Sequence, residues 1–121
     1  MTQPENDVMV EIRTYHLKPG KRVLFHKMLT EESLAMLHDQ GIRVIRFGPS
    51  LHDKDSYVLI RAFSSMSSRI QQEEDFYGSE HWLKHYDERV MAMIDIYVTV
   101  VISLPESAVV ALQDPVALPA I

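Results

Sequence analysis

Nine residues near the start of the sequence, Met9 to Leu17, alternate as a β-strand does. Glu11, Arg13 and Tyr15 recur at every second position of this run. A guanidinium presents a planar fork of donors that suits a carboxylate or an enolate oxygen. A neighbouring carboxylate can move a proton if burial raises its pKa. The spacing therefore predicts one strand face that either binds an acidic ligand or simply pairs its own charges to register a dimer.

The rest of the sequence supplies the elements that position these groups. β-Branched and aromatic residues predict four strands, at 8–17, 42–48, 56–63 and 95–104. Apolar residues at three- and four-residue spacing predict a helix over 21–39 and a second helical region over 66–93. Gly78 interrupts the second region, and Ser79 is suited to cap the helix that follows it.

The order strand, helix, strand, strand, helix, strand is that of the split βαβ, or ferredoxin-like, fold. It predicts an α+β domain over residues 8–104, with a four-stranded antiparallel sheet and helices on one face. Residues 1–7 are predicted to be disordered. Residues 105–121 form an apolar tail that packs either on its own subunit or across a partner.

The two faces of the sheet are predicted to differ in character. In each of three strands one alternate set is purely aliphatic, and we expect that set to face the helices. The opposite, open face would then carry Glu11, Arg13, Tyr15, Tyr57, Leu59, Arg61, Phe63, Tyr97 and Val101. Contiguous apolar area of this extent marks an interaction site. We therefore predict a homodimer that pairs these faces as a dimeric α/β barrel.

A ligand pocket is predicted within the open face. Its residues are Glu11, Arg13, Tyr15, Tyr57, Arg61, Phe63 and Tyr97. Arg13 and Arg61 would hold an acidic or enolisable oxygen of a small hydrophobic metabolite. Tyr15 and Tyr97 would stack on the ligand or hydrogen-bond to it. Glu11 would orient Arg13 or move a proton. No residue is assigned as catalytic, and whether the protein is an enzyme stays open.

Composition and spacing exclude several other classes of site. The net charge is −5 and the basic residues are scattered, so no nucleic-acid partner is expected. No apolar run approaches the roughly 20 residues of a membrane helix. The sequence has no cysteine, which excludes disulfides and thiolate sites and fits a cytoplasmic location.

No metal or cofactor is predicted. His81 and His85 lie four residues apart, the spacing of two ligands on one helix, but they sit off the buried stripe and lack a third ligand. The acidic run at 71–75 is predicted to be a solvated helix face.

Three segments resemble the NIPSNAP family of dimeric α/β-barrel proteins. EIRTYHLKPGK at 11–21 matches the family's Glu-x-Arg-x-Tyr-x-Leu-x-Pro-Gly signature, and FYGSEHW at 76–82 and YVTVVISLP at 97–105 add to it. The resemblance implies a ferredoxin-like subunit pairing sheet to sheet, similar in fold to antibiotic-biosynthesis monooxygenases and small haem-degrading oxygenases. Most members have no established activity. Two alternatives to metabolite binding therefore stay open: a non-enzymatic homo-oligomeric interaction protein, and an antibiotic-biosynthesis-type monooxygenase.

Overall fold

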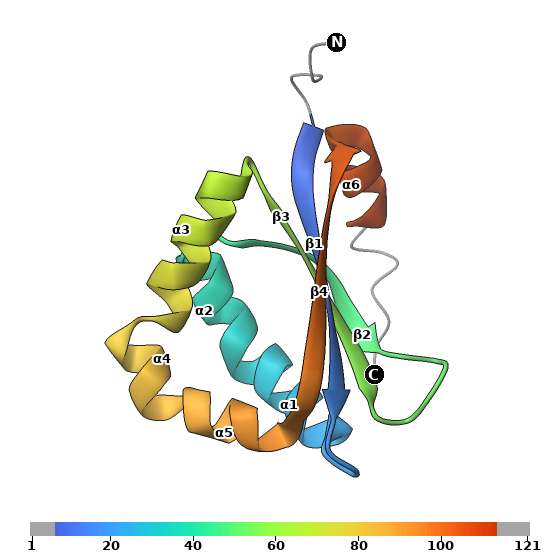
Figure 1. The fold of residues 1–121 in the computed structure, drawn as a ribbon, viewed down its shortest axis with the longest axis vertical. Helices are drawn as coiled ribbons and strands as arrows, with labels where there is room; N and C mark the ends of the chain where they lie inside the picture. The colour runs from blue at the N-terminus through green and yellow to red at the C-terminus, as the bar shows by residue number, and fades with distance from the viewer. Residues whose placement is uncertain (1–6, 114–121) are drawn as a thin grey trace.

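The computed structural model describes residues 7–113, which form one sheet and the helices around it (Figure 1). The strands are β1 (Asp7–Leu17), β2 (Arg43–Pro49), β3 (Ser56–Phe63) and β4 (Ile94–Pro105). The helices are α1 (Arg22–Met28), the π-helical η1 (Leu29–Ser33), α2 (Leu34–Asp39), α3 (Met66–Tyr77), α4 (Glu80–His85), α5 (Asp87–Met93) and α6 (Glu106–Leu112). The predictions for residues 1–6 and 114–121 lie outside the described residues.

The four strands are antiparallel and lie in the order β2-β3-β1-β4. This confirms the predicted ferredoxin-like α+β fold. The pairing places Glu11 opposite Arg61, and Arg13 opposite Thr99. Because directly opposed residues point to the same face, strand register alone gathers these side chains on one side of the sheet.

The local sequence explains where several helices begin and end. Gly20, with φ of 79°, takes a left-handed conformation in the turn before α1. Ser79 accepts a hydrogen bond from the backbone N–H of Trp82 at 3.1 Å, which confirms the predicted cap of α4. The chain leaves helical geometry a second time at Tyr86, a break that the sequence did not predict. Among residues 7–113, none of the helices has the length and apolar character needed to cross a bilayer.

The structure reverses the predicted assignment of strand faces. The predicted site residues all point toward α1 to α5 instead of lying on the open face: Glu11, Arg13, Tyr15, Tyr57, Arg61, Phe63 and Tyr97. Leu59 follows them into the core, where it packs in one cluster with Phe25 and Trp82. The prediction that the pocket lies on the open face is therefore wrong.

The size of the side chains explains this reversal. Rings and long side chains fill the space between sheet and helices, where the rings of Tyr15 and Phe25 lie 4.9 Å apart between centroids. β-Branched residues favour strands on either face, so an aliphatic set does not identify the face that helices cover. The open face consists instead of Val8, Val10, Ile12, Val58, Ile60, Ile96, Val98, Val100 and Ile102.

The open face is covered only in part, by α6. Figure 1 shows α6 on the side of the sheet opposite α1 to α5. Its Val109 is fully buried in a cluster with Val10 and Ile45. Away from α6, Ile96 and Val98 on β4 stay 59% and 57% exposed. The exposed part of β4 is thus a contiguous apolar surface within the described residues.

A bulge in β2 decides where its two arginines point. The register between β2 and β3 shifts between Val44 and Arg46. Arg43 and Arg46 therefore fall on the same face, although residues three apart in a regular strand lie on opposite faces. Both side chains hold α6. Arg43 pairs with Glu106 at 2.7 Å, and Arg46 donates to the carbonyl of Leu112 at 3.0 Å. The tail segment 106–113 thus packs on its own subunit.

Candidate functional site

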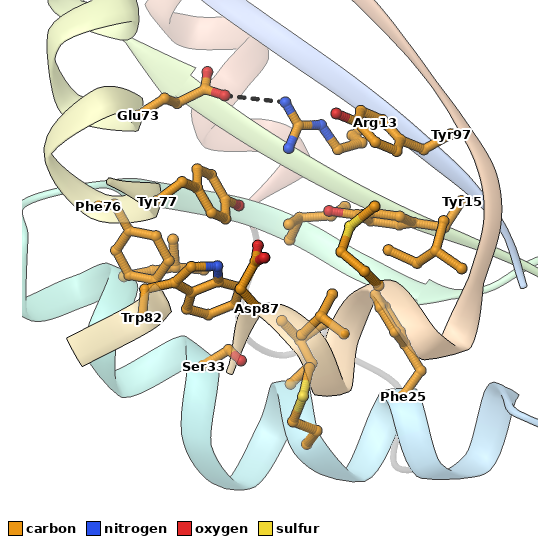
Figure 2. A pocket seen from close by; sticks show the side chains of 17 residues that line it. Arg13, Tyr15, Phe25, Ser33, Glu73, Phe76, Tyr77, Trp82, Asp87 and Tyr97 are labelled. Atoms are coloured by element: carbon orange, nitrogen blue, oxygen red, sulfur yellow. Dashed lines mark hydrogen bonds and ion pairs between the residues drawn. The ribbon is translucent and has the colours of Figure 1, made fainter. Parts of the chain in front are cut away.

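A cavity lies between the sheet and the helices (Figure 2). Its volume is about 290 Å³. Most of its wall is apolar, and aromatic rings make up much of it: Tyr15, Phe25, Phe76, Tyr77, Trp82 and Tyr97. Four polar or charged side chains interrupt that wall: Arg13, Ser33, Glu73 and Asp87. A site that is mostly apolar with a few fixed polar groups is typical of small-molecule binding.

Only part of the predicted pocket reaches this cavity. Arg13, Tyr15 and Tyr97 line it, coming from β1 and β4. Tyr57 packs in the core beneath and hydrogen-bonds to His26. Phe63 belongs to the same core cluster. The remaining two, Glu11 and Arg61, are fully buried beside the cavity. Glu11 pairs with Arg13, and Arg61 pairs with Glu73, and these two partners line the cavity.

Five charged side chains form what we call the arginine–glutamate cluster: Glu11, Arg13, Arg61, Arg69 and Glu73. Glu11 accepts hydrogen bonds from Nε of Arg61 at 2.9 Å and from Nε of Arg69 at 2.8 Å. Glu73 Oε1 accepts from Nη2 of Arg13 at 3.0 Å. Glu73 Oε2 lies 3.0 Å from Nε of Arg69 but without hydrogen-bond geometry. Such ion pairing is what burial of charge requires.

The two carboxyl groups of the cluster titrate in opposite directions. Burial alone would raise the pKa of Glu11, but a hydrogen bond with Glu73 and the charges of Arg61 and Arg13 bring it down to about 2. Burial and the neighbouring Glu11 raise the pKa of Glu73, against the opposing charge of Arg61. The two close carboxyl groups thus titrate unequally, and Glu73 takes up a proton more readily than Glu11 does.

The cluster carries net positive charge. Three guanidinium groups face two carboxyl groups, which leaves one positive charge if both acids are ionised and two if Glu73 is protonated. Arg13 is the arginine that brings this charge into the cavity, since Arg61 has no exposed side-chain surface.

The guanidinium of Arg13 is held on three sides. Its Nε donates to Thr99 Oγ1 at 3.2 Å and its Nη2 to Glu73. Its central carbon lies 5.0 Å from the ring centroid of Tyr97 and 5.9 Å from that of Tyr77, within the range of cation–π attraction. Nη1 makes no hydrogen bond to residues 7–113. A preorganised cation with one nitrogen unused is suited to an anionic ligand.

Burial also keeps a phenol of the cavity wall neutral. The pKa of Tyr15 is raised, chiefly by burial and further by the neighbouring Tyr77, against the opposing charge of Arg13. The hydroxyl of Tyr15 is therefore available as a hydrogen-bond donor and not as a base.

Most of the cavity wall was missed from the sequence, including Glu73, Tyr77, Trp82 and Asp87. Glu73 falls in the acidic run at 71–75, which was expected to be solvated. Its side chain is in fact only 14% exposed, because α3 turns it toward β1. One signal was available: Arg69 and Glu73 lie four residues apart and pair on one face of α3.

The histidines lie apart from the cavity. The rings of His81 and His85 stand 5.1 Å apart on the exposed side of α4. His16 lies at the open face, within 3.4 Å of the hydroxyl of Ser56. Within residues 7–113, no group of three or more His, Asp or Glu side chains is placed to hold a metal ion.

Known structures share this fold. No protein-family model matches the sequence, and no curated protein matches it either. A NIPSNAP family protein with unknown function from Agrobacterium tumefaciens is 20% identical, with a TM-score of 0.76 over 87% of this chain and 95% of its own. An uncharacterized NIPSNAP domain protein from Burkholderia xenovorans is 23% identical, with a TM-score of 0.71 over 80% and 93%.

A third similar structure extends the likeness beyond NIPSNAP proteins. It is a "putative antibiotic biosynthesis monooxygenase" from Nitrosomonas europaea, 15% identical, with a TM-score of 0.63 over 86% of this chain and 95% of its own. At these identities the likeness establishes the fold. The resemblance to NIPSNAP proteins seen in the sequence is thus confirmed at the level of structure, and the activity has to be argued from the site.

Proposed function

We propose that this protein binds a small hydrophobic metabolite bearing an acidic or enolisable oxygen, in the cavity between sheet and helices. The observation that carries the proposal is Arg13, which presents the net positive charge of the arginine–glutamate cluster to an aromatic cavity. The oxygen of the ligand meets Nη1 of Arg13, and its apolar body lies against Tyr15, Tyr97 and Trp82.

The division of labour within the cluster supports this role. Glu11 is ionised and fully occupied by Arg61 and Arg69, so it orients the arginines rather than moving a proton. Glu73 touches Arg13 and lines the cavity, so it is the carboxyl group able to exchange a proton with a ligand. Binding therefore extends to conversion without a cofactor if the ligand has an acidic proton within reach of Glu73.

We also propose that the protein is a homodimer of the NIPSNAP type. The support is the uncovered aliphatic surface of β4, where Ile96, Val98 and Val100 are each at least half exposed. Burial of such a surface by a second copy would remove it from water, at about 25 cal/mol per Å² of apolar area. The partner surface is the aliphatic open face and not the aromatic face expected from the sequence. The cytoplasmic location stays a prediction from the sequence.

Two alternatives have an observation in their favour. The exposed aliphatic face favours an interaction protein without a ligand, and the fold of the Nitrosomonas europaea protein favours a monooxygenase. An interaction protein would bind none of the carboxylate probes below. A monooxygenase would consume oxygen when supplied with a phenol or hydroquinone substrate.

The experiment compares the wild type with Arg13→Ala and with Arg89→Ala, whose arginine pairs with Glu32 on the surface. The probes are 3-phenylpropionate and octanoate, with 3-phenylpropanol as the uncharged control, titrated by calorimetry. We expect both carboxylates to bind the wild type, and Arg13→Ala to weaken them about tenfold or more through loss of a charged hydrogen bond. Arg89→Ala should leave binding unchanged.

The melting temperatures of the same variants separate binding from structure. Arg13→Ala should weaken carboxylate binding by a larger factor than Arg89→Ala while lowering the melting temperature by only a few degrees. Equal binding of 3-phenylpropanol and 3-phenylpropionate would contradict the proposal. So would an Arg13→Ala variant that binds as the wild type does.

A further inference from the structure

The hydroxyl of Ser33 is buried in the cavity wall without a hydrogen-bond partner among residues 7–113. The residue is only 3% exposed. A serine or threonine inside a helix commonly donates back to the carbonyl four residues earlier, and Thr30 does so to His26 at 2.9 Å. Ser33 does not. A buried hydroxyl without a partner costs free energy and calls for an explanation.

The backbone around Ser33 is unusual as well. Residues 29–33 form the π-helical segment η1, inserted between two α-helical segments. Such widened turns are rare and occur frequently at functional sites. Ser33 is the last residue of η1, so the widened turn ends at the residue whose hydroxyl is left unpaired.

A second polar group without a partner enters the same cavity from α5. Asp87 is the first residue of that helix, and Figure 2 shows its carboxylate directed into the cavity. Within the described part of the chain, this carboxylate forms neither a hydrogen bond nor an ion pair. The contrast with Glu11 and Glu73 is plain, since both of those acids are paired with arginines.

The cavity is therefore polar at two places of opposite character. Arg13 lies beside the sheet and contributes positive charge, while Ser33 and Asp87 come from the helices and contribute acceptor oxygens (Figure 2). Aromatic and aliphatic side chains separate them. An ionised carboxylate only accepts hydrogen bonds, and a serine hydroxyl can also accept one.

We propose that Ser33 and Asp87 form a second recognition point that binds a hydrogen-bond donor, a hydroxyl or an amino group, on the end of the ligand remote from its acidic oxygen. This inference rests on the proposed function and narrows its ligand class. The ligand then becomes a bifunctional molecule: an acidic oxygen at one end, an apolar body, and a donor group at the other end.

The test uses three probes of one shape: 3-phenylpropionate, its 4-hydroxy derivative and its 4-aminomethyl derivative. The wild type should bind at least one of the substituted acids about tenfold more tightly than the parent, as expected for one added hydrogen bond to a charged acceptor. Asp87→Asn and Ser33→Ala should each reduce this advantage to less than about threefold. Both variants should lose more affinity for the substituted acids than for the parent acid, because the parent offers Ser33 and Asp87 no hydrogen-bond donor. Glu88→Gln, on the exposed side of the same helix, is the matched control.

Stability supplies a readout that needs no ligand. Ser33→Ala removes an unpaired buried hydroxyl, so this variant should melt at the same temperature as the wild type or higher. A marked loss of stability would show that the hydroxyl has a structural partner, and would overturn the inference.

The outcomes separate the two proposals. Substituents that bring no advantage, or an advantage that survives both substitutions, overturn the second recognition point while Arg13-dependent binding of the parent acid stands. Failure of the wild type to bind any of the three probes overturns both.

Discussion

The two faces of this sheet differ in the side chains that they carry and in how far helices cover them. The helix-facing side carries the arginine–glutamate cluster and most of the aromatic rings, and most of these side chains are buried beneath α1 to α5. The open face carries aliphatic side chains and has only α6 upon it. Charge is thus concentrated where water is least available, and apolar surface is left where water is most available. The buried charges pair with one another, and the proposed dimer would shield the aliphatic face.

The largest expected effect comes from breaking the cluster on the helix-facing side. Arg61→Met leaves Glu11 buried without its main partner, and should lower the free energy of unfolding by about 3–5 kcal/mol. Urea denaturation measures the loss. The control is Arg89→Met, which removes a surface pair with a side chain 53% exposed and should cost less than about 1 kcal/mol. Similar losses in the two variants would contradict the expectation that the buried cluster stabilises the fold more than a surface ion pair does.

Acid titration sharpens the same point. The pKa of Glu11 falls from an ordinary 4.5 to about 2, so the folded state releases the proton more readily than the unfolded state. Its contribution is present above pH 4.5 and is lost as the pH falls toward 2, on the order of 3 kcal/mol in total.

Glu73 acts with the opposite sign. Its raised pKa gives stability that is complete below the ordinary pKa of 4.5 and is lost as the pH rises through the raised value. The free energy of unfolding should therefore depend less steeply on pH below 4.5 in Glu11→Gln. In Glu73→Gln it should depend less steeply on pH above 4.5. A pH profile unchanged by either substitution would show that the pair does not share its protons.

A substitution on the open face should weaken dimerisation while leaving the stability of the folded subunit nearly unchanged. Val98→Lys places a charge on the exposed part of β4, and should weaken dimerisation about 100-fold while changing the stability of the subunit by less than 1 kcal/mol. Sedimentation equilibrium measures the first quantity and urea denaturation the second. Leu83→Lys, at an equally exposed position on α4, is the control. A wild type that stays a monomer at micromolar concentration would contradict the partner.

The smallest effect concerns the edge of the covered area. Arg43 holds α6 through Glu106 and Gln113, with its side chain a third exposed. Arg43→Ala should cost less than about 1 kcal/mol globally, as exposed pairs do. Hydrogen exchange should nevertheless quicken in α6 more than in β1. Unchanged exchange in α6 would show that Arg43 is not needed to hold the helix.

The fold was predictable from the sequence because its signals are local. Alternation identified all four strands within one or two residues, and Ser79 identified a helix start. The faces were not predictable in the same way, since alternation divides a strand into two sets without saying which set meets the helices. Arg13, Tyr15 and Tyr97 were nevertheless identified as residues of the site, and all three line the cavity. Strand alternation and register place them on one face together, whichever face that is. Glu73 was missed because an acidic run usually lies in water. Its side chain is buried by a tertiary contact, the ion pair that it makes from α3 with Arg13 on β1.

Helix α6 has one more consequence, for the geometry of any second copy that docks on the open face. It rises above one end of the sheet, where β4 finishes and β1 begins, and leaves the stretch from Ile96 to Val100 bare. If two subunits docked on this face around a twofold axis, α6 of each subunit would limit how far the other could shift along the strands. Helix α6 would then set the offset between the two subunits.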